Sequence, residues 1–337
     1  MASVNPHLKY QKASEPAPEQ LLQQMQQGDT AALSRALTLV ESTLPRHRHL
    51  AEALIQKALP LAGNSLRIGI TGVPGVGKST FIESLGEGLT GRGYKLAVLA
   101  IDPSSAKSKG SILADKTRME KLSQNKNAFI RPTAAAGSLG GVARRTREAI
   151  LLCEATGYDV VLVETVGVGQ SETAVKYMVD FFMLLMLATT GDELQGIKRG
   201  IMEMADLLII HKADDPNDKQ VRFAMGEYKR ALHLFPPNAN EWIPRVQAAS
   251  ALKNTGMEAV WDTVKEFERQ QKLKGYFDKN RAEQALHWFH EALGNLVLEA
   301  LNEKPKFSAA KTQMEQRIRR GEMEAFAAAH ALMEKFF

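Results

Sequence analysis

The sequence has a single cysteine, Cys153, among 337 residues. One thiol cannot form an internal disulfide or a thiolate cluster, which favours a reducing compartment. No stretch approaches the roughly eighteen uninterrupted apolar residues that a membrane-spanning helix needs. The first residues, which include His7, Lys9 and Glu15, lack the apolar core of a signal peptide. We therefore expect a cytoplasmic protein that makes no use of a membrane.

A strong excess of charge of one sign is also missing. The 43 basic and 38 acidic residues give a net charge of +5, which is too small for a general attraction to nucleic acid or anionic lipid unless the charge is clustered. The densest basic runs, residues 144–147 and 317–320, fall in helix-like sequence. We interpret them as solvated faces or partner contacts, in preference to the alternative of a nucleic-acid site.

From residue 64 onward, short apolar runs alternate with amphipathic segments of helix length, a pattern typical of a mostly parallel α/β sheet. Their near-continuous apolar character suits strands covered on both faces. Strands are predicted at residues 66–71, 95–102, 128–132, 159–165, 180–189, 206–211 and 242–248.

The segments on either side of this region are predicted to be helical. Residues 19–61 carry leucines at helical spacing. A helix is expected over 255–271, and two more between 279 and 337, broken near Pro305. We predict an N-terminal helical extension (1–62), a nucleotide-binding domain (63–272) and a C-terminal helical arm (273–337).

The C-terminal arm has apolar positions but no sheet to cover them: Leu286, Phe289, Leu293, Leu296 and Leu298. A helical tail without a complete core commonly packs on another subunit, so the arm is predicted to form a homodimer. The alternative is that it folds back on its own domain.

The strongest motif is a complete G-x-x-x-x-G-K-S that follows a predicted strand and opens a predicted helix. In such a loop the backbone N–H groups and the helix N-terminus surround phosphate oxygens. Lys78 is expected to bridge the β- and γ-phosphates, Ser79 to ligate Mg²⁺, and Thr80 to lie near the α-phosphate. The residues assigned to the nucleotide here are Gly72, Val73, Pro74, Gly75, Val76, Gly77, Lys78, Ser79 and Thr80.

A phosphate loop also needs a carboxylate on a neighbouring strand to hold the hydration shell of the magnesium ion. Asp102 and Glu164 each lie at the end of a predicted strand. A buried carboxylate there is costly unless it meets a cation. The structural alternative is a cap, and for Asp102, which Pro103 and Ser104 follow, an Asx-turn.

The segment His211-Lys212-Ala213-Asp214 lies where GTPases carry Asn-Lys-x-Asp. The Asp214 carboxylate can accept hydrogen bonds from the ring N–H and amine of guanine, a donor pair that adenine lacks. GTP or GDP is therefore expected rather than ATP. His211 replaces the usual asparagine and cannot reproduce its amide geometry. After the last strand, Ser250, Ala251 and Leu252 resemble the loop whose backbone contacts the guanine carbonyl.

Together these motifs resemble the MeaB/ArgK GTPases, which include the methylmalonic aciduria type A proteins, within the signal-recognition and nitrogenase-like class of P-loop proteins. The resemblance covers about residues 50–267. The glutamate that opens Glu-Thr-Val-Gly, where most GTPases have aspartate, is a feature of the family. The motifs that carry the resemblance are residues 72–80, 101–105, 115–119, 164–172 and 191–198.

The resemblance implies a GTP-driven chaperone of an adenosylcobalamin-dependent acyl-CoA mutase that works as a homodimer. It makes Asp102, Asp115 and Glu164 the carboxylates around magnesium and the switch regions. The resemblance also places Lys198 in a loop that responds to the mutase and completes the hydrolytic site. Without the resemblance, we would interpret Lys198 as a solvated lysine on a helix. No glutamine directly follows Gly167, where small GTPases orient the attacking water, so slow intrinsic turnover is expected.

Two other functions remain open at this point. A metal-inserting GTPase usually needs cysteine and histidine ligands, but one cysteine and eight scattered histidines form no close cluster. An ATP-dependent kinase, a role once suggested for ArgK-type proteins, is opposed by Asp214 and by the lack of a visible second substrate site. A dimeric scaffold without activity would not explain why phosphate and magnesium residues coexist.

Overall fold

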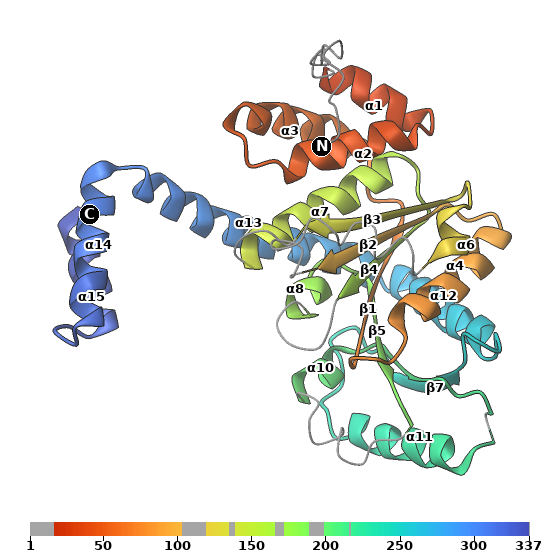
Figure 1. Cartoon of the computed structure of the whole chain (residues 1–337). Coiled ribbons are helices and arrows are strands. Elements are labelled where there is room, and N and C mark those ends of the chain that lie inside the picture. The colour runs from red at the N-terminus through yellow and green to blue at the C-terminus, as the bar shows by residue number, and fades with distance from the viewer. Residues whose placement is uncertain are drawn as a thin grey trace, which may run out of the picture. The chain divides into compact units, whose positions relative to one another are not determined.

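The structure is a computed structural model that describes residues 17–102, 119–134, 139–165, 172–188, 199–215 and 217–336. Its centre is a sheet of seven parallel strands in the order β3-β2-β4-β1-β5-β6-β7 (Figure 1). The strands are β1 (Leu66–Gly72), β2 (Leu96–Asp102), β3 (Ala128–Ala134), β4 (Val160–Thr165), β5 (Phe181–Met186), β6 (Leu207–His211) and β7 (Arg245–Ala249).

All seven predicted strands are present, and the sheet is wholly parallel in its described pairings. The residues of β4, β5 and β6 are buried throughout, as expected for strands with helices on both faces. Two boundaries were wrong by three residues. Strand β5 ends at Met186 rather than at residue 189, and β7 begins at Arg245 rather than at Trp242.

Helices cover both faces of the sheet (Figure 1). The connections from β1 to β2 and from β2 to β3 run in one direction along the sheet, whereas those from β3 onward run in the other. Right-handed crossovers therefore place the helices in two layers. One layer contains α4 (Lys78–Gly91), α6 (Glu120–Ser123) and α12 (Met257–Leu273); the other contains α7 (Leu139–Ala155), α8 (Glu172–Lys176), α10 (Arg199–Met204) and α11 (Lys219–Leu232). None of the described helices has the length and apolarity that crossing a bilayer requires.

The N-terminal helices α1 (Pro18–Gln26), α2 (Thr30–Glu41) and α3 (Pro45–Ala58), followed by the short 3₁₀ helix η1 (Leu59–Leu61), pack on one another and against α7. The Asp29 side chain caps α2 by accepting from the N–H groups of Ala31 and Ala32. Arg131 of β3 donates to Glu41 of α2 at 2.6 Å. The predicted extension is thus attached to the sheet and belongs to the same compact unit.

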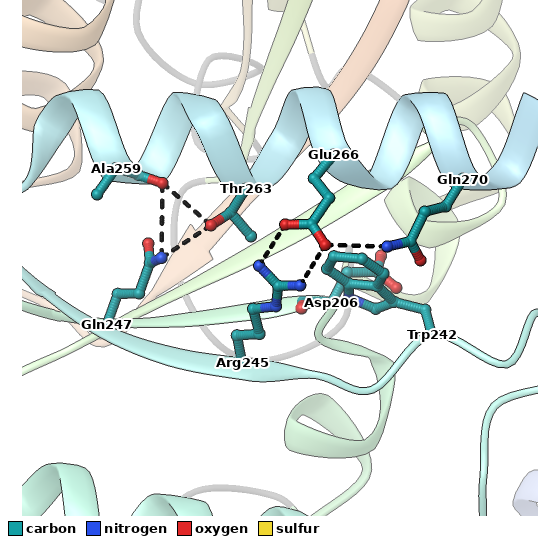
Figure 2. A network of polar contacts seen from close by, with 8 residues as sticks. All are labelled: Asp206, Trp242, Arg245, Gln247, Ala259, Thr263, Glu266 and Gln270. Atoms are coloured by element: carbon teal, nitrogen blue, oxygen red, sulfur yellow. Dashed lines mark hydrogen bonds and ion pairs between the residues drawn. The ribbon is translucent and has the colours of Figure 1, made fainter.

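A network of polar contacts links α12 to β7, and links Trp242 to Asp206, the residue before β6 (Figure 2). Arg245 forms a bidentate ion pair with Glu266, with both N–O distances at 2.7 Å. The Trp242 indole N–H donates to the carbonyl oxygen of Asp206 at 2.9 Å, and the Gln247 amide donates to Thr263 at 2.8 Å. These contacts hold the last two strands in place, and the loops at their carboxyl ends reach the functional site.

The remaining residues form a second compact unit, Asn280–Phe337. It contains most of α13 (Tyr276–Asn302), with α14 (Pro305–Arg319) and α15 (Ala325–Phe336). The prediction of only two helices in this region was wrong, because the chain breaks a second time at Gly321, whose φ of +69° ends α14. Helices α14 and α15 pack through Phe307 and Phe336, whose rings lie 5.2 Å apart.

Candidate nucleotide-binding site

The glycine-rich segment joins the central strand β1 to α4. Gly77 has a φ of +92°, a left-handed conformation that favours glycine, and Lys78 begins the helix. A Cβ atom on Gly72 would lie 2.5 Å from the carbonyl oxygen of Leu185 on β5, so the close approach of these strands requires glycine. The loop conformation therefore depends on residues far from it in the chain.

The side chain of Lys78, the first residue of α4, turns back into the glycine-rich loop. Its Nζ donates to the carbonyl oxygen of Gly72 at 3.0 Å, and the residue is only 9% exposed. Burial lowers the pKa of the Lys78 ammonium, while the carboxylates of Glu164 and Glu172 oppose that shift. The arrangement holds a cation against the loop, in the position where phosphate oxygens would meet it.

Ser79 and Glu164 are brought together from α4 and β4. The Ser79 hydroxyl donates to Glu164 Oε1 at 3.4 Å, and Glu164 is 8% exposed. Glu164 is in register with Ala100 of β2, two residues before Asp102 at the end of that strand. The donor set consists of hydroxyl and carboxylate oxygens, which fits Mg²⁺. Asp115 and Lys198 lie outside the described residues.

The segment after β6 contacts the phosphate loop through two side chains. His211 Nδ1 lies 2.7 Å from the carbonyl oxygen of Val76, and Lys212 Nζ donates to that of Gly75 at 2.8 Å. Lys212 has a φ of +59°, an uncommon conformation for a residue with a side chain. The segment therefore bends sharply over the loop, and the predicted base and phosphate residues occupy one region.

Asp214 is fixed by the loop that follows β7. The Ser250 hydroxyl donates to Asp214 Oδ1 at 2.5 Å and accepts from the N–H of Lys253 at 3.1 Å. Ser250 also pairs with Thr255 through two backbone hydrogen bonds. Leu252, by contrast, is 78% exposed. The structure thus brings together Asp214 and Ser250, which are 36 residues apart in the chain.

Sequence reasoning missed one residue and one contact of this site. Glu172, at the start of α8, is 3% exposed and acts electrostatically on Lys78. Its position at the end of the 164–172 motif was the available signal. The second is the contact of His211 with Val76, which no local pattern reveals because the two residues are 135 positions apart.

A parallel sheet whose central strand runs through a glycine loop into a helix, with lysine and serine at the start of that helix, defines a P-loop nucleoside triphosphatase. The comparisons narrow this class. The family model described as "Methylmalonyl Co-A mutase-associated GTPase MeaB" matches residues 33–306. The chain therefore belongs to the MeaB family of methylmalonyl-CoA mutase-associated GTPases, and it is a GTPase.

The similarity to individual proteins is consistent with membership of this family. A probable GTPase of Mycobacterium tuberculosis is 48% identical over 307 residues, 91% of each chain. The mitochondrial methylmalonic aciduria type A homolog of Mus musculus is 45% identical over 319 residues, 92% of this chain and 77% of the relative. A crystal structure of an LAO/AO transport system kinase matches with a TM-score of 0.76 and 37% identity over 99% of both chains.

Family membership bears on the kinase, one of the two alternatives that the sequence left open. Membership in a GTPase family removes the kinase alternative for this chain, although the name of the structural relative retains that word. Among the described residues, no group of three or more His, Cys, Asp or Glu side chains could hold a metal ion. The family description names a mutase, which agrees with the resemblance found in the sequence.

Proposed function

We propose that this GTPase is a chaperone of an adenosylcobalamin-dependent acyl-CoA mutase of the methylmalonyl-CoA type, and that its nucleotide state gates loading or protection of the cofactor. The observation that carries the proposal is a phosphate loop that holds Lys78, together with the Ser250–Asp214 contact, in a chain of the mutase-associated family. The name of the mouse relative, which refers to methylmalonic aciduria, supports the same partner. A cytoplasmic location remains a prediction from the sequence.

In this proposal, the phosphate loop binds the nucleotide through backbone N–H groups of residues 72–80, apart from Pro74, which has none. Lys78 releases the Gly72 carbonyl and turns to the β- and γ-phosphates, since its ammonium gains more from an anion than from a neutral oxygen. Ser79, Glu164, Asp102 and Asp115 would hold Mg²⁺, which would supply neutralisation of phosphate charge. Asp214 would accept from the guanine N–H groups, next to the 250–252 loop.

Hydrolysis by such a site needs positioning more than covalent chemistry. We infer slow intrinsic turnover, because no glutamine follows Gly167 directly. The proposed stimulant is the mutase, whose binding would bring Lys198 of the 191–198 segment to the phosphates. A cation that acts mainly in the transition state accelerates turnover with little effect on nucleotide affinity.

We also propose that the C-terminal region forms a homodimer. The five apolar residues of α13 named in the sequence analysis are each between 42% and 58% exposed. Exposed apolar side chains on a helix are stabilised by burial against a second apolar surface. Removal of residues 280–337 should give a monomer that still binds GDP. Light scattering that still shows a dimer would place the interface elsewhere.

The coupling between nucleotide and mutase can be measured directly. If the mutase prefers one nucleotide state, it must shift the affinity for that nucleotide by the same factor, because binding free energies are reciprocal. We expect affinities for a purified methylmalonyl-CoA mutase to differ several-fold between the GDP state and the state with a non-hydrolysable GTP analogue. Equal affinities in both states and without nucleotide would contradict gating.

A further inference from the structure

His211 is the final residue of β6 and stands where most GTPases have asparagine. It is 3% exposed and packs against the phosphate loop. A Cβ atom on Gly77 would lie 3.2 Å from its Cε1 atom, and the Phe81 ring meets the imidazole edge-to-face with centroids 5.5 Å apart. The ring is therefore held by the loop on one side and by α4 on the other.

The hydrogen bond to Val76 fixes the tautomer of His211. Nδ1 lies 2.7 Å from a carbonyl oxygen, which can only accept, so Nδ1 carries the proton. Burial lowers the pKa of His211, against the opposing effect of the Val76 carbonyl. The neutral ring therefore has a bare Nε2 atom with a lone pair, which can accept a hydrogen bond but cannot donate one.

Nε2 is also out of reach of a ligand. The atom is inaccessible to solvent and has no hydrogen-bond partner among the described residues. A guanine base that enters from solvent cannot contact an atom that water does not reach. In addition, the edge of guanine that carries N7 and O6 offers only acceptors, and a bare nitrogen lone pair repels them.

We propose that His211 is a positioning residue that latches the phosphate loop to β6 through Val76, and that it makes no contact with guanine. Recognition of the base in this chain then rests on Asp214 and the 250–252 loop. The N7 atom receives no hydrogen bond from position 211. This inference concerns the nucleotide site alone and holds whether or not the mutase proposal does.

The test compares GDP with 7-deaza-GDP, in which a C–H group replaces N7. Wild-type protein should bind the two nucleotides with dissociation constants within about twofold of each other, because no hydrogen bond to N7 is lost. A loss of fivefold or more with 7-deaza-GDP would overturn the proposal that His211 leaves the base untouched.

Two variants test the latch. His211→Ala removes the Val76 contact and should weaken both nucleotides equally, by about tenfold. His211→Asn restores an N–H donor and should bind GDP more tightly than the alanine variant. An unchanged affinity in His211→Ala, or no recovery in His211→Asn, would overturn the latch. His233→Ala, at an exposed histidine after α11, is the matched control. If His211→Ala does not fold, wild type and His211→Asn still decide the question.

Discussion

The hydroxyl of Ser250 donates a hydrogen bond of 2.5 Å to the carboxylate of Asp214. The two residues come from loops after different strands, β7 and β6. Because Ser250 also accepts from the Lys253 N–H, its donor proton is directed to Asp214. The serine therefore fixes the carboxylate that is proposed to read the base.

Ser250→Ala should lower GDP affinity roughly tenfold, since a hydrogen bond to a charged group contributes about 1.5 kcal/mol or more. Calorimetric titration with GDP measures the effect. Thr156→Ala is the control, because that hydroxyl donates to the carbonyl oxygen of Leu152, at the far end of α7. Equal losses in both variants would mean that Ser250 has no specific link to the base.

Asp214→Asn should exchange the base preference. The amide can donate to the extra carbonyl of xanthine but no longer accepts two hydrogen bonds from guanine, so affinity should move from GDP to xanthosine diphosphate by at least tenfold in ratio. Competition against a fluorescent guanine nucleotide reports the ratio. If it stays as in wild type, Asp214 does not contact the base.

Glu164→Gln should weaken the dependence of GTP binding on magnesium. The neutral amide keeps the size of the side chain but removes the charge beside Ser79. GTP affinity measured in Mg²⁺ should fall several-fold relative to wild type, while affinities in excess chelator should be equal for the two proteins. Equal affinities in Mg²⁺ would remove Glu164 from the metal site.

Glu154 of α7 is predicted to be a major stabilising residue. Its fully buried carboxylate accepts from Arg67 at 2.7 and 2.8 Å, from Ser65 at 2.6 Å and from the Gly63 N–H at 3.0 Å. Glu154→Ala leaves a mostly buried guanidinium without its carboxylate, which costs about 3 kcal/mol of unfolding free energy. Urea titration measures that loss.

The control is Glu258→Ala. Its ion pair with Arg92 has the same 2.7 Å distance, but Glu258 is 76% exposed. Its removal should cost less than about 1 kcal/mol, because solvent screens exposed pairs. Similar losses for Glu154→Ala and Glu258→Ala would show that burial is not what strengthens the Arg67 pair.

The seven strands could be predicted because each is a continuous apolar run between helical segments. The start of β7 could not be predicted, because Trp242 is apolar and buried but lies outside the strand. Its ring packs 5.2 Å from Phe267 and its N–H bonds to Asp206. Tertiary packing, which a local pattern does not contain, accounts for that error.

The candidate site likewise has a part that the sequence could propose and a part that it could not. Sequence motifs were enough to propose the glycine loop, Ser79, Glu164 and Asp214 as site residues. Phosphate, magnesium and guanine each require particular chemical groups at the ends of strands. The Val76 latch could not be predicted, since it joins residues on β6 and the β1–α4 loop whose proximity arises only when β5 and β6 pair in register.

The most direct test of the central proposal is GTP turnover with and without a methylmalonyl-CoA mutase, for wild type and Lys198→Ala. We predict that the mutase accelerates wild-type turnover at least tenfold and that Lys198→Ala loses most of this acceleration while keeping its intrinsic rate and nucleotide affinity. Equal stimulation of both proteins would exclude Lys198 from the mechanism. Absence of stimulation by every acyl-CoA mutase tested would contradict the chaperone proposal itself.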